Sequence, residues 1–314
     1  MIGPIEQARQ HADATAIFAE GISYSYAELI KAADVISQVL LAGRTDLAEA
    51  RISFMVAPGF DYVSILWGIW QAGGIAVPLG IGHPLPVIRH SVEDSGTTIL
   101  IIGPGFDSVL SSFAKVESLR IIELSSVTAN SPQGSLPRIS PDRRALMLYT
   151  SGTTDLPKGV VTTHRNIQAQ VVTLISAWKW SARDRVLCVL PLHHVHGLIN
   201  IVCCSLWAGA TCEFISEFNA KKVFRIFLTR RINVFMAVPT IYHKLASYWE
   251  SVPPGEKTVM SDALRTFRLM VSGSAALPAT VMEKWKAISG HQLLERYAMT
   301  EIGMAISNPY EGDR

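Results

Sequence analysis

The stretch ISFMVAPGFDYVSILWGIWQAGGIAVPL, residues 52–79, carries the pattern that decides the fold. Two short, almost entirely apolar segments, ISFMV (residues 52–56) and AVPL (residues 76–79), flank SILWGIWQAGG (residues 64–74), whose apolar residues have helical spacing. Short apolar strands connected by helices are typical of a parallel sheet that is buried on both faces. This stretch therefore predicts an α/β fold.

A stretch rich in Ser and Pro divides the chain. The sequence SSVTANSPQGSLPRISPDRR, residues 125–144, has no apolar periodicity and is typical of a linker. We therefore expect an N-terminal α/β lobe at residues 1–125, a linker at residues 126–144 and a second α/β lobe at residues 145–314.

The second lobe is expected to continue the alternation of strands and helices. Its predicted strands are residues 185–191, 211–215, 233–239 and 267–274. Its predicted helices are residues 164–178, 197–207, 221–230, 241–248 and 278–289.

Composition argues against several classes of protein. Lys and Arg total 28 against 26 for Asp and Glu, and a net charge of +2 does not suggest nucleic acid or an anionic membrane as partner. The apolar run LINIVCCSLWAGA, residues 198–210, is shorter than the roughly 20 residues that a bilayer requires, so we expect a buried helix and no membrane span. The four cysteines lack CxxC spacing and are expected to be reduced and buried, with a metal site as the alternative. The N-terminus shows no export or transit signal, which predicts a cytoplasmic protein; the sequence does not indicate an oligomeric state.

The segment YTSGTTDLPKGVV, residues 149–161, places hydroxyl and glycine residues directly after a predicted strand. Gly152 and Gly159 would allow backbone N–H groups to converge, the hydroxyls can donate to phosphate oxygens, and Lys158 adds a positive charge. The order Pro-Lys-Gly differs from the common P-loop. The pattern indicates a phosphate site, and a solvent-exposed turn is the alternative.

With the residues that follow, this segment resembles the phosphate-loop signature of the adenylate-forming acyl-CoA synthetases, the AMP-binding superfamily. The resemblance implies ATP binding by Thr150, Ser151, Gly152, Thr153, Thr154, Lys158 and Gly159. Asp155 stands where the superfamily usually has Gly. We expect this carboxylate to weaken ATP binding by like-charge repulsion and by loss of a glycine conformation.

Three histidines follow a predicted strand in PLHHVHGL, residues 191–198. Open α/β sheets bind ligands at the carboxyl ends of their strands, so the position favours a binding role. A metal site is the alternative, although strand alternation is expected to send His193 away from its neighbours. The resemblance places His194 at the histidine that shapes the acyl pocket, and we expect His196 to point into the substrate cavity.

Two further segments complete the resemblance. In FRLMVSGSAALP, residues 267–278, it implies that Gly273, Ser274 and Ala275 flank the adenine. In LLERYAMTEIGMA, residues 293–305, an aromatic ring, a hydroxyl and a carboxylate suit a nucleotide with Mg²⁺. The implied nucleotide-binding residues there are Glu295, Arg296, Tyr297 and Thr300, with Glu301 as the Mg²⁺ ligand and Met299 at the substrate. Ala298 replaces a Gly of the superfamily pattern.

The order of the four segments identifies the chain as a member of this superfamily, and their amino-acid sequences are most similar to those of malonate–CoA ligases. The resemblance implies the parallel-sheet-rich N-terminal large domain of such an enzyme, built from two stacked α/β lobes. It implies formation of an acyl-adenylate from ATP and a small carboxylic acid, then thioester formation with coenzyme A. Lys158, Thr300 and Glu301 would be the catalytic residues, and malonate the acid. The small C-terminal domain that carries a further catalytic Lys in the family is not expected within these residues, so we expect weak or no activity from these residues alone.

The resemblance implies that Arg268 binds the second carboxylate of the acid. It lies on an otherwise apolar predicted strand, and a buried Arg needs an anionic partner. On this reading, Arg268→Met should abolish malonate use and spare monocarboxylates; an internal ion pair is the alternative. Other hypotheses remain open: a synthetase for another short-chain acid, a nucleotide-binding regulatory protein that pairs with a longer paralogue, and a mitochondrial location.

Overall fold

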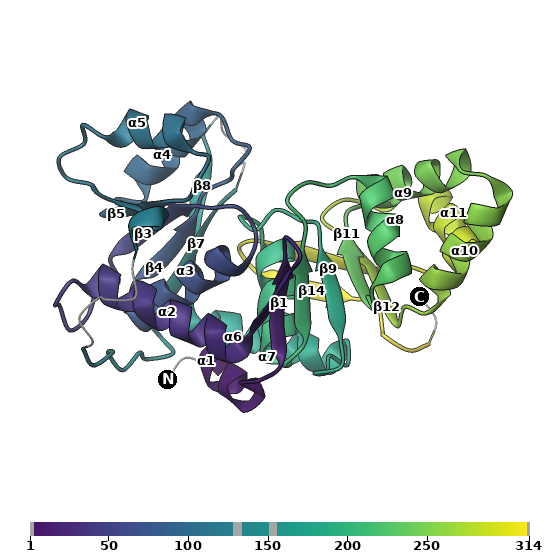
Figure 1. Cartoon of the computed structure of the whole chain (residues 1–314), viewed down its shortest axis with the longest axis horizontal. Coiled ribbons are helices and arrows are strands. Elements are labelled where there is room, and N and C mark those ends of the chain that lie inside the picture. The colour runs from purple at the N-terminus through teal and green to yellow at the C-terminus, as the bar shows by residue number, and fades with distance from the viewer. Residues whose placement is uncertain (1–2, 128–133, 151–155, 313–314) are drawn as a thin grey trace.

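The computed structural model describes residues 3–127, 134–150 and 156–312. It is an α/β fold with two sheets, each mainly parallel and covered by helices, as the sequence predicts (Figure 1). No helix of the described residues is long and apolar enough to cross a membrane. All four cysteines are free and buried, in agreement with the prediction.

The first sheet has six strands in the order β6-β5-β3-β4-β7-β8. Its members are β3 (Arg51–Met55), β4 (Ile75–Pro78), β5 (Ile99–Ile102), β6 (Arg120–Glu123), β7 (Arg144–Thr150) and β8 (Lys158–Thr163). Only the edge pair β7 and β8 is antiparallel among the described pairs. The two strands of this pair flank residues 151–155.

The second sheet has eight strands in the order β14-β13-β12-β11-β9-β10-β1-β2. Its members are β1 (Thr15–Ala19), β2 (Ile22–Ser25), β9 (Arg185–Cys188), β10 (Thr211–Phe214), β11 (Val234–Ala237), β12 (Leu269–Ser272), β13 (Leu294–Met299) and β14 (Gly303–Ser307). The inner strands are parallel, and β2 and β14 are antiparallel to their neighbours.

The sheets do not follow the division predicted at residues 126–144. Strands β7 and β8 come after that stretch and complete the first sheet, whereas β1 and β2 come before it and join the second sheet. The predicted linker therefore does not separate two independent lobes. Composition indicates where the chain is irregular, but not which strands pair.

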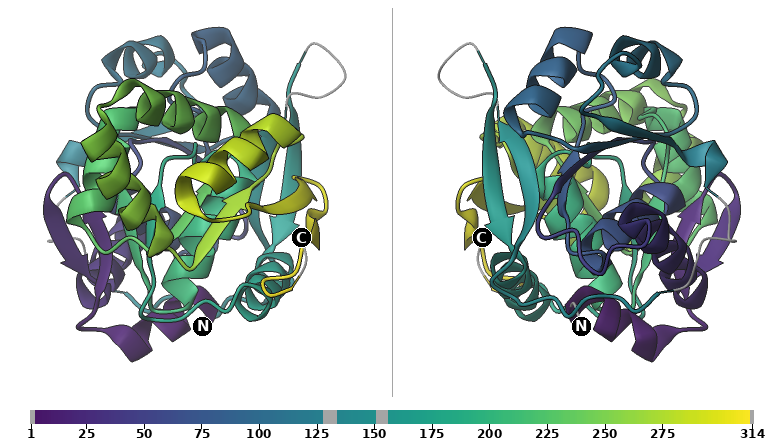
Figure 2. Two further views of the ribbon diagram at one scale, coloured as in Figure 1. Left: turned by 90° about the vertical axis from the view of Figure 1, so that its right-hand side faces the viewer. Right: turned by 90° about the vertical axis from the view of Figure 1, so that its left-hand side faces the viewer.

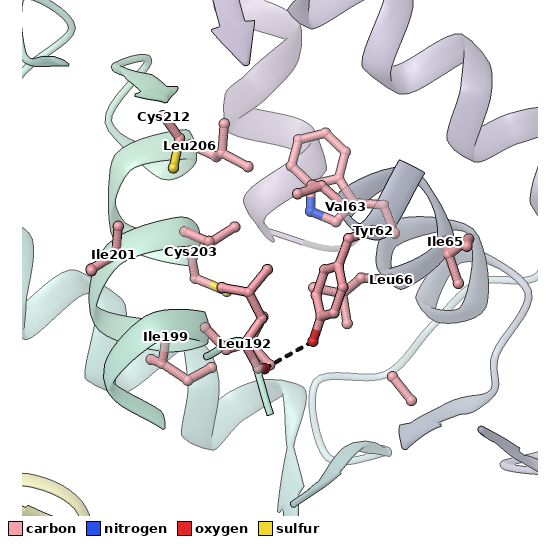
Figure 3. Close-up of a cluster of buried hydrophobic side chains, with 14 of the residues drawn as sticks. Tyr62, Val63, Ile65, Leu66, Leu192, Ile199, Ile201, Cys203, Leu206 and Cys212 are labelled. Atoms are coloured by element: carbon pink, nitrogen blue, oxygen red, sulfur yellow. Dashed lines mark hydrogen bonds between the residues drawn. The ribbon is translucent and has the colours of Figure 1, made fainter. Parts of the chain in front are cut away.

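Helices α2 (Tyr26–Leu41) and α3 (Phe60–Gln71) join the two sheets into one core. Ser25 caps the N-terminus of α2 in a capping box. Its side chain accepts a hydrogen bond from the Glu28 backbone N–H, and the Glu28 carboxylate accepts one from the Ser25 backbone N–H. Gly68 lets the helices approach closely, because a Cβ there would lie 2.6 Å from an Ile36 methyl carbon. Figure 3 shows α3 packed against the apolar segment around Cys203, with the Tyr62 hydroxyl donating to the Leu192 carbonyl at 2.8 Å.

The remaining helices lie around this core. They are α1 (Gly3–Ala8), α4 (Leu85–Asp94), α5 (Asp107–Phe113), α6 (His164–Ala177), α7 (Cys204–Trp207), α8 (Ala220–Thr229), α9 (Pro239–Ser251), α10 (Pro254–Arg265) and α11 (Ala279–Ser289), with short 3₁₀ turns at Arg9–His11 and Leu124–Ser126. The five helices predicted for the second lobe are confirmed within a few residues, except that the segment from His196 to Cys203 is a π-helix that leads into α7. The sequence did not predict α10, β13 or β14.

Candidate active site

The carboxyl ends of β9, β12 and β13 bring three of the predicted segments together. β12 ends at Ser272, which is paired with Glu295 on β13, so Gly273 and Ser274 follow beside Arg296. The π-helix after β9 begins at His196, and its ring faces the same point. This is the edge of the sheet at which open α/β folds bind ligands.

A cluster of His196, Ser274 and Arg296 occupies this edge, in which His196 and Arg296 are buried and Ser274 is exposed. The Arg296 Nη2 group donates to Ser274 Oγ at 3.1 Å, and Ser274 Oγ lies 3.1 Å from His196 Nδ1. Gly273 makes the cluster possible, because a Cβ at this position would lie 2.5 Å from Arg296 Nε. Ser274 adopts φ +69°, a left-handed conformation that is strained for a residue with a side chain and typical of functional sites.

The cluster presents two N–H donors that have no partner among the described residues. Since Ser274 Oγ accepts from Arg296, its hydroxyl proton is free to go to His196 Nδ1, which leaves the proton of a neutral imidazole on Nε2. His196 Nε2 and Arg296 Nε are both buried and unpaired within the described part of the chain. Such groups cost free energy unless a ligand or water pairs with them.

The charge states of the cluster follow from burial. Burial lowers the pKa of Arg296 to about 10, so the guanidinium remains a cation at neutral pH. Burial, and next the charge of Arg296, holds the pKa of His196 well below its usual range, so this imidazole is neutral. One buried cation beside a neutral donor matches a carboxylate ligand.

A cavity of about 500 Å³ opens beside this cluster. It contains five of the predicted nucleotide-binding residues, and its lining is Ser274, Ala275, Ala276, Glu295, Arg296, Tyr297, Ala298, Ile306 and Asn308. The Tyr297 ring is half exposed there, in a position where a planar base could stack. Ala298 lies within β13, at an irregularity in the pairing with β14, and its φ is not positive, so no glycine is required for the backbone conformation at this position.

A second cavity of about 430 Å³ lies between β8, α6 and the turn that joins β13 to β14. Thr300 and Glu301 are on this turn and line the cavity, as does Val161 of β8. In both views of Figure 2 the β13–β14 hairpin lies beside β7 and β8. Gln170 of α6 holds the turn by accepting a hydrogen bond from the Met304 backbone N–H, a role that no sequence pattern indicates.

The phosphate segment is described only at its two ends. Ser151, Gly152, Thr153, Thr154 and Asp155 lie outside the described residues. Thr150 and Lys158 face each other across the β7–β8 ladder, and the Lys158 side chain is exposed. Gly159 is within β8 and paired with Tyr149, at a φ that other residues adopt, so its backbone conformation does not require glycine.

His194 belongs to a different cluster from His196. Its ring lies 4.2 Å from that of His193, which in turn lies 4.7 Å from the ring of His83. The prediction that His193 points away from its neighbours is wrong, because β9 ends at Cys188 and the alternation of a strand does not continue to residue 193. Among the described residues, no group of three or more His, Cys, Asp or Glu could hold a metal ion. Met299 is exposed on β13 and lines neither cavity.

The histidine cluster predicts a pH dependence of stability. Burial, and next the neighbouring histidines, lowers the pKa of His193 from 6.5 to about 3. The unfolded chain therefore binds a proton that the folded chain does not, and stability falls as pH decreases from about 6.5 toward 3. Between pH 7 and pH 5 the unfolding free energy of the His193→Phe variant should therefore decrease by up to about 2 kcal/mol less than that of the parent. Urea unfolding at both pH values measures this difference. An equal decrease in the variant and the parent would contradict the prediction.

Arg268 lies at the opposite end of β12 from the cluster and is held in an internal ion pair. Its Nε and Nη2 groups donate to the two carboxylate oxygens of Asp184 at 2.6 and 2.7 Å, and its Nη1 group donates to the Trp178 carbonyl at 2.9 Å. The Asp184 side chain is 1% exposed. Arg268 precedes β12, at the amino end of the strand, whereas the ligand edge is at the carboxyl end. The contacts therefore support the ion-pair alternative and not a role at the acid.

Comparison with known proteins agrees with this architecture. The family model described as AMP-binding enzyme matches residues 5–314. The bovine (Bos taurus) mitochondrial malonate–CoA ligase ACSF3 is 43% identical over 301 residues, 92% of this chain and 51% of that protein. The malonate–CoA ligase of Arabidopsis thaliana is 35% identical over 343 residues, 98% of this chain and 56% of that protein. The chain thus spans about half the length of the curated relatives it matches.

Solved structures give the same result. Apo MatB from Rhodopseudomonas palustris has a TM-score of 0.86 at 28% identity, covering 100% of this chain and 63% of that chain. A malonyl-CoA ligase in a ternary product complex with methylmalonyl-CoA and AMP has a TM-score of 0.83 at 29% identity, covering 100% and 64%. With the family match over nearly its whole length, this chain belongs to the AMP-binding enzyme family.

Proposed function

We propose that this chain is the ATP- and acid-binding portion of an AMP-forming acid–CoA ligase whose acid is malonate or another small dicarboxylate. Family membership supports the reaction class. Relatives named malonate–CoA ligases, and the neighbour solved with methylmalonyl-CoA and AMP, support the acid. The cluster of His196, Ser274 and Arg296, with its buried histidine and arginine, is the observation that carries the proposal.

The two unpaired donors of this cluster favour a second carboxylate. We propose that a carboxylate accepts from these two buried, unpaired groups, His196 Nε2 and Arg296 Nε, and that the guanidinium charge compensates the charge of the carboxylate. A monocarboxylic acid would leave both buried donors unpaired, and sites built to hydrogen-bond a substrate strongly reject analogues that lack the matching group. A small dicarboxylate therefore fits this site better than a fatty acid.

The proposed reaction has two steps. The acid carboxylate attacks the α-phosphorus of ATP, the bond from that phosphorus to the bridging oxygen breaks, and pyrophosphate leaves. The sulfur of coenzyme A then attacks the acyl carbon, and AMP leaves as the thiol proton is released. In this proposal Lys158 and the hydroxyls of Thr150, Ser151, Thr153 and Thr154 stabilise charge on the phosphates. Gly273, Ser274, Ala275 and Tyr297 surround the adenine, and Thr300 contacts the α-phosphate.

Glu301 supplies the kind of group that Mg²⁺ requires. Its carboxylate is exposed on the turn that lines the second cavity, and hard oxygen atoms are the ligands that Mg²⁺ prefers. When bound there with the phosphates, the ion would neutralise part of their charge. The compartment is also a proposal: the animal relatives named mitochondrial favour the mitochondrial alternative over the cytoplasm.

We expect Asp155 to make ATP binding weaker than it would be with the family Gly at this position. We expect Asp155→Gly to tighten ATP binding by about 1 kcal/mol or more, because it removes a like charge and restores the family glycine. Calorimetric titration with ATP measures the change. Equal affinities in the two proteins would show that the carboxylate does not face the phosphates.

Malonate-dependent exchange between ATP and labelled pyrophosphate tests the proposed function. We expect at most weak exchange from these residues alone, because the further catalytic Lys of the family is not expected within them, and any exchange should require both malonate and Mg²⁺. ATP binding that malonate does not affect would instead favour a nucleotide-binding regulatory protein. Exchange that proceeds faster with a monocarboxylate would favour a synthetase for another acid.

A further inference from the structure

Asn200 is a fully buried polar residue of the π-helix that begins at His196. The residue is 0% exposed, and within the described part of the chain neither Nδ2 nor Oδ1 of its amide has a hydrogen-bond partner. Its neighbours in sequence, Ile199 and Ile201, are buried in the apolar cluster of Figure 3 and offer no polar side-chain atom. Most buried side-chain amides are hydrogen-bonded, because an unpaired amide costs free energy, so Asn200 requires an explanation.

The π-helix directs Asn200 toward the cluster of His196, Ser274 and Arg296. Backbone hydrogen bonds of a π-helix join residues five apart, so roughly one turn separates His196 from Asn200 and the two lie on nearly the same side. Side chains of a right-handed helix lean toward its N-terminal end, which brings the Asn200 amide toward His196. The unpaired Nε2 is the nitrogen of the His196 ring that lies farther from the backbone, since Nδ1 contacts Ser274 Oγ.

The cost of an unpaired amide points to a ligand and not to a structural role. Leucine has nearly the size of asparagine and no polar atom, as have the buried residues on either side of Asn200 in the helix. Replacement of a buried, unpaired polar group by an apolar one of similar shape is neutral or stabilising. Within the described residues, Asn200 therefore makes no side-chain hydrogen bond that the fold needs. Polar groups that oppose local stability are typical of functional sites.

We propose that Asn200 determines specificity for the acid: its Nδ2 group donates a third hydrogen bond to the carboxylate that we assign to His196 Nε2 and Arg296 Nε. This inference rests on the proposed function, since it assumes that the second carboxylate binds at this cluster. A carboxylate has about four lone-pair positions and can accept from all three groups. Oδ1 of the amide cannot bond to it, because both groups only accept. A monocarboxylic acid would leave this third buried donor unpaired, so Asn200 strengthens the preference for a dicarboxylate.

Calorimetric titration and urea unfolding of the Asn200→Leu variant test the inference. We expect malonate affinity to fall about ten-fold or more, the usual effect of one hydrogen bond to a charged group. Propionate, which has no second carboxylate, and ATP should each bind within about two-fold of the parent. The free energy of unfolding should be equal to that of the parent or higher, because the variant no longer buries an unpaired amide. A structural role of the amide would instead make the variant less stable.

Two further variants separate the inference from a packing defect. Asn200→Ala cannot overfill the space, and it should show the same selective loss of malonate affinity. Ser272→Ala is the control, because Ser272 Oγ is also buried and unpaired within the described residues. Alternation along β12 places Ser272 on the side of Met270, which packs in a separate apolar cluster from the π-helix. This variant should leave malonate affinity unchanged.

The outcomes distinguish this inference from the proposed function. If the parent binds malonate and Asn200→Leu binds it equally well, the inference is overturned and the proposed function stands. The same holds if Asn200→Leu loses malonate and propionate affinity to the same extent. Absence of malonate binding by the parent chain would overturn the proposed function, and the inference with it.

Discussion

Arg296→Met is expected to abolish the preference of this protein for malonate over propionate. The two acids have three carbons each and differ in the second carboxylate, which we assign to Arg296 Nε and His196 Nε2. Loss of a charge-assisted hydrogen bond in a buried site costs about 2–3 kcal/mol, so malonate affinity should fall roughly 30- to 150-fold. Propionate affinity should change little. Calorimetric titration with both acids measures the effect.

Arg296→Lys is the matched control for this prediction. It keeps the positive charge and loses the planar fork, so it cannot donate to Ser274 and to an acid in the same geometry. We expect partial recovery of malonate affinity with this variant. If Arg296→Met weakens both acids equally, or leaves malonate affinity unchanged, the second carboxylate does not bind at this cluster.

Arg268→Met is expected to destabilise the fold by about 3 kcal/mol or more. The substitution would leave the Asp184 carboxylate, 1% exposed, without its compensating cation, and breaking a buried ion pair on one side typically costs about 3–5 kcal/mol. The backbone N–H of Ser181 and the side chain of Asn233 also donate to Asp184, so part of its hydrogen bonding would remain. Urea denaturation measures the loss.

Arg165→Met is the control, because Arg165 makes a similarly short contact with Asp142 on the surface, where the two side chains are 63% and 69% exposed. Exposed ion pairs contribute about 0–1 kcal/mol, so this variant should remain near parental stability. A folded Arg268→Met protein with parental stability that loses only malonate binding would contradict the structural role and return Arg268 to the acid site.

The elements of the fold could be predicted where apolar periodicity is strong, as at β3, α3 and β4. The pairing of strands could not, because nothing local in Arg144–Thr150 shows that this strand joins β4 as well as β8. β13 was not predicted, because its sequence LERYAM does not alternate apolar with polar residues. The buried position at Arg296 is polar, since that side chain faces the site. Polar residues that serve the site thus replaced the apolar residues by which a strand is recognised in sequence.

The site could be predicted at the level of segments, because each of its motifs ends or follows a strand. Individual roles were harder to assign. Arg268 and Arg296 both accompany buried strands, and sequence alone does not show that Asp184, distant in the chain, neutralises the first. Gly159 was expected to shape the loop, yet its missing side chain makes room for Tyr149. The role of Arg268 depends on a residue distant in the sequence, and the role of Gly159 depends on its partner across the strand ladder. Neither contact can be derived from local sequence.

The most direct test of the account is the relative affinity of the parent chain for malonate and propionate, measured by calorimetric titration. If the cluster of His196, Ser274 and Arg296 holds the second carboxylate, malonate should bind at least about ten-fold more tightly than propionate. Propionate binding that equals or exceeds malonate binding would contradict the assignment of this protein to small dicarboxylic acids.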